Sequence, residues 1–346
     1  MHRGMTSISP QLRLCCLSGL FALVVWGQSA AALDESLAAE AVTRAGELER
    51  THSLLVAVDG EIVLEESYRG PGTAQPANVK SLSKTVLAAL VGAAIEQGLV
   101  AGDEQPIAEL IGTRMPENTE PGVSDITVGH LLAMQSGLER TSGANYGRWV
   151  ASDDWVTAAL TRPFVDAPGG RMLYSTGNSH ILSAALTWAS GRTTRELAQD
   201  WLGNPLNIVI PEWPRDPQGI YFGGNDMNLS PRALLQIGEL YRHDGVLNGE
   251  RVLPEGWVEN SWTPRGRSPF NNNQYGYGWF ITELDGEPAY YGWGFGGQML
   301  YVIPSVAMTI VITSDPTPPG SGSAYLRHLD ALVAETLIPA ARRARQ

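Results

Sequence analysis

The chain of 346 residues contains only two cysteines and only two lysines, and both shortages limit its chemistry. Cys15 and Cys16 lie in an N-terminal stretch that we expect to be removed, so the mature chain would lack disulfides and thiolate nucleophiles. Lys80 and Lys84 are the only lysines, and every other basic residue is arginine. Arginine stays charged, whereas a buried lysine can lose its proton and serve as a base. We favour such a base at Lys84 and interpret Lys80 as a chance survivor.

Several other features are missing, and each absence excludes a class of protein. The formal charge of -12 argues against nucleic acid as a partner. The sequence has no Gly-x-Ser-x-Gly elbow, no metal-spaced histidines and no phosphate loop, so we expect no metal and no cofactor. No histidine accompanies a plausible nucleophile, which leaves a Ser-His-Asp triad unsupported, and His130 fits a core histidine better than a catalyst.

The N-terminus has the three parts of a secretory signal. Arg3 and Arg13 supply the positive region, and Leu14 to Trp26 is an apolar run that is short for a transmembrane helix. Small residues then offer a cleavage site just before Leu33. We therefore predict a signal peptide at residues 1–32, export to the periplasm or the medium, and no stable membrane span after its removal.

The remaining chain predicts an α+β fold with strands at both ends and helices between them. Asp59-Gly60 is a tight-turn signal, and terminal helices are expected at Leu33 to Glu49 and at Tyr325 to Arg345. The expected strands are Ser53 to Val58, Glu61 to Tyr68, Tyr277 to Leu284, Pro288 to Tyr291, Gln298 to Ile303 and Val306 to Thr313. We predict one catalytic domain at residues 33–346, in which 33–77 and 276–346 form a lobe with an antiparallel sheet flanked by the terminal helices, and 78–275 form a mostly helical lobe.

Ser81 and Lys84 stand at the start of a helix that is apolar on every side and extends to Gly98. One helical turn separates them, so the two side chains can meet on one face. A serine beside a neutral lysine is a nucleophile beside its base. The alternative is structural, because serine is also a favoured capping residue at the first turn of a helix. A helix of this kind would be buried where the two lobes meet, which is where pockets form.

Two further segments are candidates for the same site. Tyr174 lies in Tyr174-Ser175-Thr176-Gly177-Asn178, which we place in a loop before a helix at Ser179 to Ser190. A tyrosine can act as an acid or base, although taken alone a loop tyrosine more often packs its ring.

The run Gly292 to Gln298 matches Gly-x-Gly-x-x-Gly, but a strand follows it, which excludes a dinucleotide fold. Its glycines indicate either close backbone approach to a ligand, with an N–H for an oxyanion, or a hairpin bend.

Taken in order, these segments resemble the serine β-lactamase and penicillin-binding superfamily, in its class C-like branch. That branch includes β-lactamase-related esterases, D-peptidases and aminohexanoate-oligomer hydrolases. The segments that carry the resemblance are Ser81-Leu82-Ser83-Lys84 for Ser-x-x-Lys, the stretch from Thr127 to Leu138 for a structural helix that ends in Ser-Gly-Leu, Tyr174-Ser175-Thr176 for Tyr-x-Asn, and Gly292-Trp293-Gly294 for Lys-Thr-Gly. The resemblance extends from about His52 to Ala340.

The resemblance implies a β-lactamase/transpeptidase-like fold and an acyl-serine mechanism. It makes Ser81 the nucleophile, with Lys84 and Tyr174 sharing the general-base work and Tyr174 passing the proton to the leaving group. The backbone N–H groups of Ser81 and Phe295 would form the oxyanion hole. Residues at the positions of the family's substrate contacts are Thr176, Trp293 and Gly294.

Two departures from the family pattern point to the substrate. Thr176 replaces the asparagine that holds the substrate amide and the lysine, and Gly292 replaces the lysine that attracts a carboxylate. Both favour a small ester or a linear amide over a β-lactam or a D-Ala-D-Ala peptide. The alternatives are a low-rate β-lactamase or carboxypeptidase, and a sensor or binding protein without turnover. The apolar pocket wall is expected from Trp293 and Phe295, and Tyr146 and Trp149 either join this wall or are simply core or surface aromatics. Loops such as Gly219 to Asn228 would select the substrate.

Overall fold

An eight-stranded antiparallel sheet joins the two ends of the chain in the strand order β2-β1-β12-β11-β10-β9-β8-β7. The computed structural model describes residues 32–317 and 322–346, so the predicted signal peptide lies outside the described residues except for Ala32. The strands are β1 (Thr51–Val58), β2 (Glu61–Ser67), β7 (Gly266–Arg267), β8 (Gln274–Tyr275), β9 (Phe280–Leu284), β10 (Glu287–Gly294), β11 (Gln298–Ile303) and β12 (Met308–Ser314). The predicted α+β fold is confirmed.

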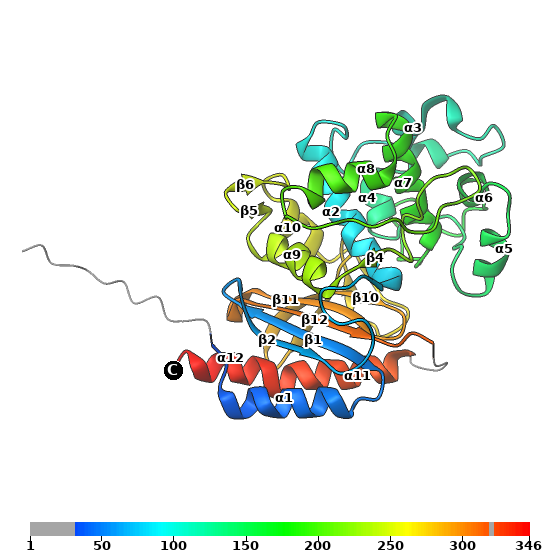
Figure 1. Cartoon of the computed structure of the whole chain (residues 1–346). Coiled ribbons are helices and arrows are strands. Elements are labelled where there is room, and N and C mark those ends of the chain that lie inside the picture. Colours follow the sequence, from blue (N-terminus) through cyan, green and yellow to red (C-terminus); the bar gives the residue numbers. More distant parts are fainter. Residues whose placement is uncertain (1–31, 318–321) are drawn as a thin grey trace, which may run out of the picture. The chain divides into compact units, whose positions relative to one another are not determined.

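Alternating side chains of the central strands fill two separate cores. Leu54 and Val56 of β1 pack in the core beneath the terminal helices α1 (Glu35–Glu47), α11 (Gly322–Leu332) and α12 (Ile338–Ala344), which cover one face of the sheet (Figure 1). Leu55 and Ala57 pack in the core on the opposite face, toward the helical lobe. The two-residue period of a strand produces this division. Asp59 and Gly60 have φ of 51° and 87°, which fits the predicted tight turn between β1 and β2.

The helical lobe lies on the other side of the sheet from the terminal helices (Figure 1). Its centre is α2 (Ser83–Glu96), in which every residue from Ser83 to Ala94 is buried, as the all-apolar pattern predicts. The other helices are α3 (Ile107–Ile111), α4 (Val128–Leu132), α5 (Tyr146–Val150), α6 (Trp155–Leu160), α7 (Thr176–Ser190), α8 (Thr194–Ala198), α9 (Pro231–Arg242) and α10 (Trp257–Trp262). Two-stranded pairs are formed by β3 (Ala77–Asn78) with β4 (Asn228–Leu229) and by β5 (Val246–Leu247) with β6 (Glu250–Arg251). Among the described residues, no helix combines the length and the apolarity that a bilayer crossing requires.

Two local features differ from the sequence predictions. Helix α7 begins at Thr176, three residues before the predicted start at Ser179, because the first turn carries polar residues that break the apolar pattern. Strands β7 and β8, which come from the segment expected in the helical lobe, hydrogen bond to one another and to the sheet edge at β9. Strands of two residues are too short to show any periodicity.

Candidate active site

Ser81 lies in a single 3₁₀ turn, Lys80–Leu82, that leads directly into α2. Ser81 caps neither helix, because the N-cap positions are Val79 and Leu82, so the capping alternative is wrong. Ser83 makes the local bond instead, by donating its hydroxyl to the Lys80 carbonyl at 2.6 Å. The Ser81 hydroxyl therefore remains available, and it lines a cavity between the lobes.

Lys84 brings its amine to the Ser81 hydroxyl, with 3.2 Å between Nζ and Oγ. The same Nζ lies 2.6 Å from the carbonyl oxygen of Gly224 and 3.4 Å from Oγ1 of Thr176. A neutral amine has two N–H donors and one lone pair, so donation to Gly224 and Thr176 leaves the lone pair facing Ser81. Lys84 is only 3% exposed, and this burial lowers its pKa to about 7, while the Asp226 carboxylate acts in the opposite direction.

Tyr174 completes the group around the Ser81 hydroxyl. Its side chain is hydrogen bonded to that of Ser81, and Lys84 Nζ lies 4.9 Å from the centroid of its ring. Burial raises the pKa of Tyr174 to about 12, and the hydrogen bond to Ser81 acts against this rise. The phenol is therefore protonated at neutral pH and can donate a proton.

Thr176 lies behind the lysine and away from the cavity. It is only 4% exposed, and its hydroxyl contacts Lys84 Nζ and, at 3.0 Å, the hydroxyl of Ser142. Thr176 N also donates to Ser142 Oγ at 2.8 Å. We expected Thr176 at the substrate, but its contacts are those of a residue that holds the base.

The edge of β10 lies directly against the segment that carries Ser81. A Cβ on Gly294 would collide with the Val79 carbonyl, and a Cβ on Gly292 would collide with Leu82 and Thr85. Gly296 and Gly297, with φ of 86° and 96°, form the bend into β11. The predicted hairpin bend is therefore confirmed at Gly296 and Gly297. Gly292 and Gly294 permit the close approach of a protein segment, and the approach of a ligand stays a prediction.

A cavity of about 260 Å³ opens above the Ser81 hydroxyl, and its walls are aromatic. It is lined by Ser81, Tyr174, Phe270, Trp293 and Phe295. The Phe270 ring packs edge-on against Tyr174 and against Trp293, at centroid distances of 5.1 and 5.9 Å. Phe270 and Phe295 are 45% and 50% exposed, so part of each ring faces solvent at the rim. The lining contains no charged side chain.

Two expected wall residues lie elsewhere. Trp149 is 1% exposed and packs in the helical core against Trp155 and Phe222, so its alternative as a core aromatic is confirmed and its place in the pocket wall is excluded. Tyr146 does not line the cavity, and its hydroxyl accepts a hydrogen bond from Asn225 at 3.2 Å. The local sequence around Tyr146 and Trp149 does not distinguish a core or surface aromatic residue from one that lines a pocket.

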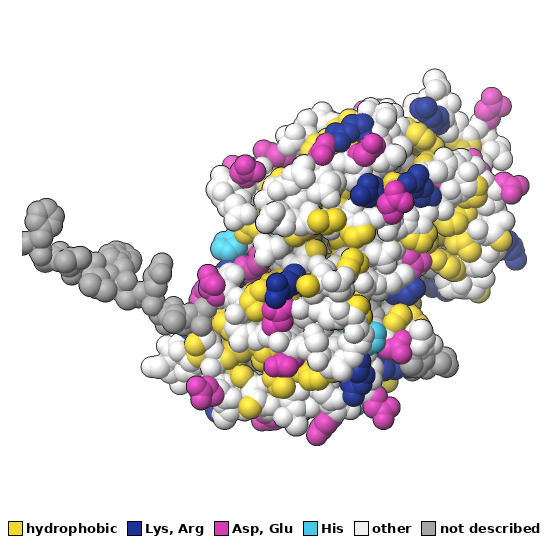
Figure 2. Space-filling model, in the orientation of Figure 1, with side chains coloured by type: hydrophobic (Ala, Val, Ile, Leu, Met, Phe, Trp, Pro, Cys, Tyr) yellow, Lys and Arg dark blue, Asp and Glu magenta, His cyan; other side chains and the backbone are white. Residues whose placement is uncertain are grey.

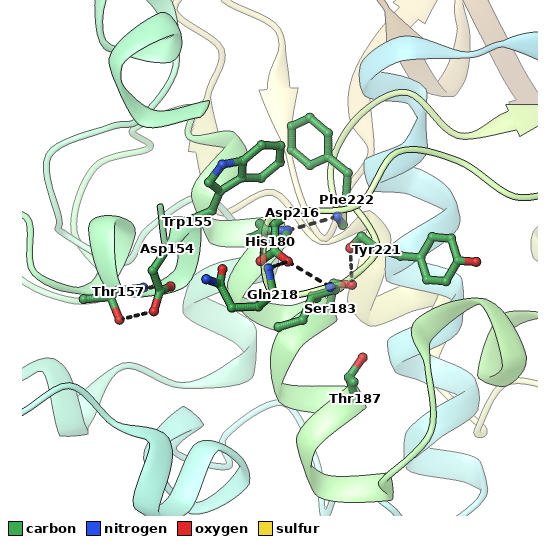
Figure 3. A network of polar contacts seen from close by, with 12 residues as sticks. Asp154, Trp155, Thr157, His180, Ser183, Thr187, Asp216, Gln218, Tyr221 and Phe222 are labelled. Carbon is green, nitrogen blue, oxygen red and sulfur yellow. Dashed lines mark hydrogen bonds and ion pairs between the residues drawn. The ribbon is translucent and has the colours of Figure 1, made fainter. Parts of the chain in front are cut away.

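The loop that supplies Gly224 is held by a buried pair. His180 Nε2 of α7 lies 2.9 Å from Asp216 Oδ2, and neither side chain has any exposed surface (Figure 3). The other oxygen of Asp216 accepts backbone N–H groups of its own loop, at Gln218 and Ile220. This pair fixes the loop to α7 on the side of the base that faces away from the cavity.

Sequence analysis did not assign Phe270 to the site, and it expected the loop from Gly219 to Asn228 to select the substrate. That loop contacts Lys84 through Gly224 and supplies no residue to the cavity lining. One signal was present, because Gly223-Gly224 interrupts the loop with two adjacent glycines. A Cβ on Gly223 would collide with the backbone of Ser179, so the loop can cross α7 closely enough to reach Lys84 only with glycine there. Phe270 follows a proline in a polar stretch and carries no comparable signal.

Comparison with known proteins agrees with this architecture. Residues 45–335 match the family described as Beta-lactamase. A 6-aminohexanoate-dimer hydrolase of Paenarthrobacter ureafaciens is 25% identical over 293 residues, which cover 75% of this chain and 71% of the relative.

Two solved structures share the fold at low identity. A D-stereospecific amidohydrolase from a Streptomyces species has a TM-score of 0.67 at 17% identity, over 88% of this chain and 99% of that one. EstCE1, a hydrolase with promiscuous acyltransferase activity, has a TM-score of 0.68 at 17% identity, over 87% of this chain and 99% of that one. The chain belongs to the Beta-lactamase family, and its relatives with this fold are serine hydrolases.

Proposed function

We propose that this protein hydrolyses small esters or linear amides through an acyl-serine intermediate on Ser81. The observation that carries the proposal is the contact of 3.2 Å between Ser81 Oγ and Lys84 Nζ, at an amine whose burial lowers its pKa to about 7. An amine with that pKa is largely neutral at slightly alkaline pH and can accept the hydroxyl proton.

In the first step, Lys84 takes the proton of Ser81 while Oγ attacks the carbonyl carbon of the substrate. The developing oxyanion is bound by the backbone N–H groups of Ser81 and Phe295, which belong to residues that line the same cavity. The N–H of Ser81 belongs to the first turn of a helix, where backbone donors have no intrahelical partner.

In the second step, the tetrahedral intermediate collapses, and the proton that Lys84 accepted passes through Tyr174 to the leaving alcohol or amine, so that Lys84 is neutral again and Tyr174 is protonated. Tyr174 suits this role because its phenol is hydrogen bonded to Ser81 and has a pKa of about 12. Water then attacks the acyl-serine, and the same groups act in the reverse order. In this division of labour, Lys84 is the base and Tyr174 is the proton relay.

The preferred substrate is one without an essential carboxylate. The cavity lining is aromatic and uncharged, and a lysine at position 292 would have to displace Leu82 and Thr85. A cavity of about 260 Å³ accommodates a short acyl chain or a single ring. The names of the relatives, an aminohexanoate-dimer hydrolase and an amidohydrolase, support amides beside esters.

The direct test is hydrolysis of p-nitrophenyl esters with short acyl chains. We expect Ser81→Ala to lower kcat/KM by at least about 1,000-fold, because the nucleophile is removed. Ser36→Ala removes an exposed hydroxyl from α1, on the far face of the sheet, and serves as the matched control. Equal turnover by Ser81→Ala and the wild type would refute the proposal.

Parallel assays separate the alternatives. We expect a chromogenic cephalosporin and a D-Ala-D-Ala peptide to react at least about 100-fold more slowly than the best ester, because the cavity lining contains no cationic side chain to bind their carboxylates. The opposite ranking would identify a β-lactamase or carboxypeptidase. A stable adduct with an active-site serine reagent but no turnover of any substrate would identify a sensor.

Export is a separate part of the proposal and rests on residues 1–32 alone. We expect the full chain to appear in the periplasm or medium with its N-terminus near Leu33, as measured by fractionation and N-terminal sequencing. Retention of Met1 in a cytoplasmic fraction would contradict this part and leave the chemistry untouched.

A further inference from the structure

Two segments far apart in the sequence are joined directly behind Ser81. Strand β3 pairs with β4, so that Asn78 lies opposite Asn228. Val79 N then donates to the Met227 carbonyl at 2.9 Å, and Met227 N donates to Ser83 Oγ at 3.0 Å. The turn that carries the nucleophile is thereby fixed to the loop that contacts the base.

Lys80 and Asp226 form the charged centre of this junction. Lys80 Nζ lies 2.8 Å from Asp226 Oδ1, and their side chains are only 28% and 20% exposed. Asn78 closes the arrangement by donating Nδ2 to the same carboxylate oxygen at 3.0 Å and accepting Lys80 N–H at 2.9 Å. Lys80 and Asp226 have φ of 51° and 60°, a conformation unfavourable for residues other than glycine, which the surrounding bonds hold in place.

The carboxylate of this pair acts on Lys84. It favours the protonated form of that amine and so opposes the lowering of the Lys84 pKa by burial. A protonated Lys84 has no lone pair for the Ser81 proton. The ammonium of Lys80 is bonded to the same carboxylate and carries the opposite charge, so it opposes the effect of Asp226 on Lys84.

Tyr174 and Tyr146, the two tyrosines near the base, are uncharged at neutral pH. Burial raises the pKa of Tyr174 to about 12, and it also raises the pKa of Tyr146, whose hydroxyl contacts the Asn225 amide. On the loop's other side, His180 of α7 is bonded to Asp216. Among the described residues, Asp226 is the charged group that acts on Lys84 through space.

We propose that Lys80 and Asp226 form a positioning pair for Lys84, in which Asp226 anchors the loop that presents Gly224 and Lys80 neutralises the carboxylate that would otherwise keep Lys84 protonated. The sequence interpretation of Lys80 as a chance survivor is replaced by this role, and both lysines of the chain then serve one device. The role in catalysis rests on the proposed function, whereas the electrostatic coupling can be measured without it.

The presence of only two lysines permits a direct test. Protein labelled with ¹³C at the lysine ε-carbons gives two resonances, and Lys80→Arg identifies that of Lys84. We expect Lys80→Met to raise the pKa of Lys84 by about half a pH unit or more, and Asp226→Asn to lower it by a similar amount. The double variant should lie between the two single variants.

Two controls distinguish an effect of charge on the Lys84 pKa from an effect of altered folding. Lys80→Arg keeps the positive charge and should leave the Lys84 pKa within about 0.3 units of the wild type. Arg232→Gln breaks an exposed ion pair with Glu65, remote from the site, and should not change it. If Lys80→Met fails to fold, the near-isosteric Asp226→Asn variant decides the question alone.

The acid limb of kcat/KM for the ester should move with the Lys84 resonance, to higher pH in Lys80→Met and to lower pH in Asp226→Asn. Shifts of both single variants in the same direction, or an unmoved Lys84 with a uniform loss of activity, would overturn the proposal. Opposite shifts of the resonance in a protein without hydrolase activity would refute the proposed function and keep the coupling.

Discussion

Lys84 is a lysine removed from the water that normally keeps an amine charged. Its side chain is 3% exposed, and burial lowers its pKa to about 7 from the ordinary value of 10.5. The neutral amine is what the proposed chemistry requires, and it also costs stability. An unfolded chain would bind a proton at this lysine throughout the physiological pH range, whereas the folded chain binds it only below about pH 7.

This residue predicts the pH dependence of the reaction. Activity should rise with pH through a midpoint near 7, because Lys84 accepts the serine proton only in its neutral form. No alkaline decline is expected below about pH 10, since the pKa of Tyr174 is about 12. A profile of kcat/KM between pH 5 and 10 measures both limbs, and activity that falls across the range from 6 to 8 would contradict this role.

Tyr174→Phe should separate the relay from the base. The ring still packs against Phe270, but the hydroxyl bonded to Ser81 is lost, so we expect kcat to fall about 100-fold or more. The midpoint near pH 7 should remain, because Lys84 is unchanged. Steady-state kinetics on an ester measure both quantities, and a variant with full activity would exclude Tyr174 from the mechanism.

Lys84→Met should inactivate the enzyme and stabilise its fold. The folded-state pKa of Lys84 lies below the ordinary one. The stability lost by burying Lys84 therefore grows as pH falls from about 10 to about 7, and it is constant below that. Methionine has similar length and no charge to lose, so we expect a gain of roughly 1–3 kcal/mol at pH 6 that disappears near pH 10. Urea unfolding at both pH values measures this difference. Destabilisation at pH 6 would show that burial does not lower the pKa of Lys84.

At the scale of elements, the site depends on how closely β10 approaches the helix that carries Ser81. Gly292 and Gly294 are glycines because the neighbouring segment occupies the space of a side chain. Position 292 corresponds to the lysine of the Lys-Thr-Gly pattern. In this chain the side chains of Leu82 and Thr85 occupy the space that a side chain at position 292 would need. Thr85 is itself fixed by donation of its hydroxyl to the Gly278 carbonyl at 2.7 Å.

Gly292→Lys should consequently damage the fold and add no β-lactamase activity. We expect destabilisation of about 2–4 kcal/mol, because a buried side chain collides with packed atoms and its charge has no partner. Gly147→Lys, at an exposed position of α5 where a Cβ meets nothing within 4 Å, is the matched control. Thermal unfolding and a cephalosporin assay measure the two effects, and a stable variant that hydrolyses the cephalosporin would contradict this explanation.

The elements themselves were predictable from the sequence because their signals are local. Strand-like runs on either side of a tight turn placed β1 and β2, aromatic and β-branched residues placed β11 and β12, and the all-apolar run predicted the burial of α2. Ser81 and Lys84 were found because one helical turn separates them.

Asp226 and Gly224 were not found, because they lie more than 100 residues from the lysines they contact, and sequence periodicity does not indicate such contacts. Phe270 reaches the cavity from a hairpin of two-residue strands, which is invisible to pattern analysis.

At the scale of the whole molecule, strands from both chain ends close the fold. β1 pairs with β12, and the terminal helices cover the sheet face opposite the active site (Figure 1). The face in Figure 2 shows acidic and basic side chains interspersed among the described residues. One contact between helix and sheet is titratable, because Tyr301 of β11 donates its hydroxyl to Asp330 of α11 at 2.8 Å.

Asp330 makes global stability depend on pH. Burial raises the pKa of its carboxyl to about 6, so the folded chain favours the protonated form more than the unfolded chain does. The stability that the protonated carboxyl of Asp330 contributes is lost as pH rises from about 4 to about 6. Asp330→Asn should therefore raise the free energy of unfolding by roughly 1–2 kcal/mol at pH 8 and change it little at pH 4. Urea unfolding of both proteins at the two pH values measures this, and a gain confined to pH 4 would reverse the argument.

The central claim is that Ser81, activated by Lys84, carries the acyl group. The most direct measurement is rapid quenching of the reaction with a p-nitrophenyl ester, followed by mass spectrometry of the proteolytic peptides. We expect the acyl mass on the peptide that contains Ser81 in the wild type, and no such mass in Ser81→Ala or Lys84→Met. An acyl group on another residue, or hydrolysis that Ser81→Ala sustains at the wild-type rate, would contradict the account.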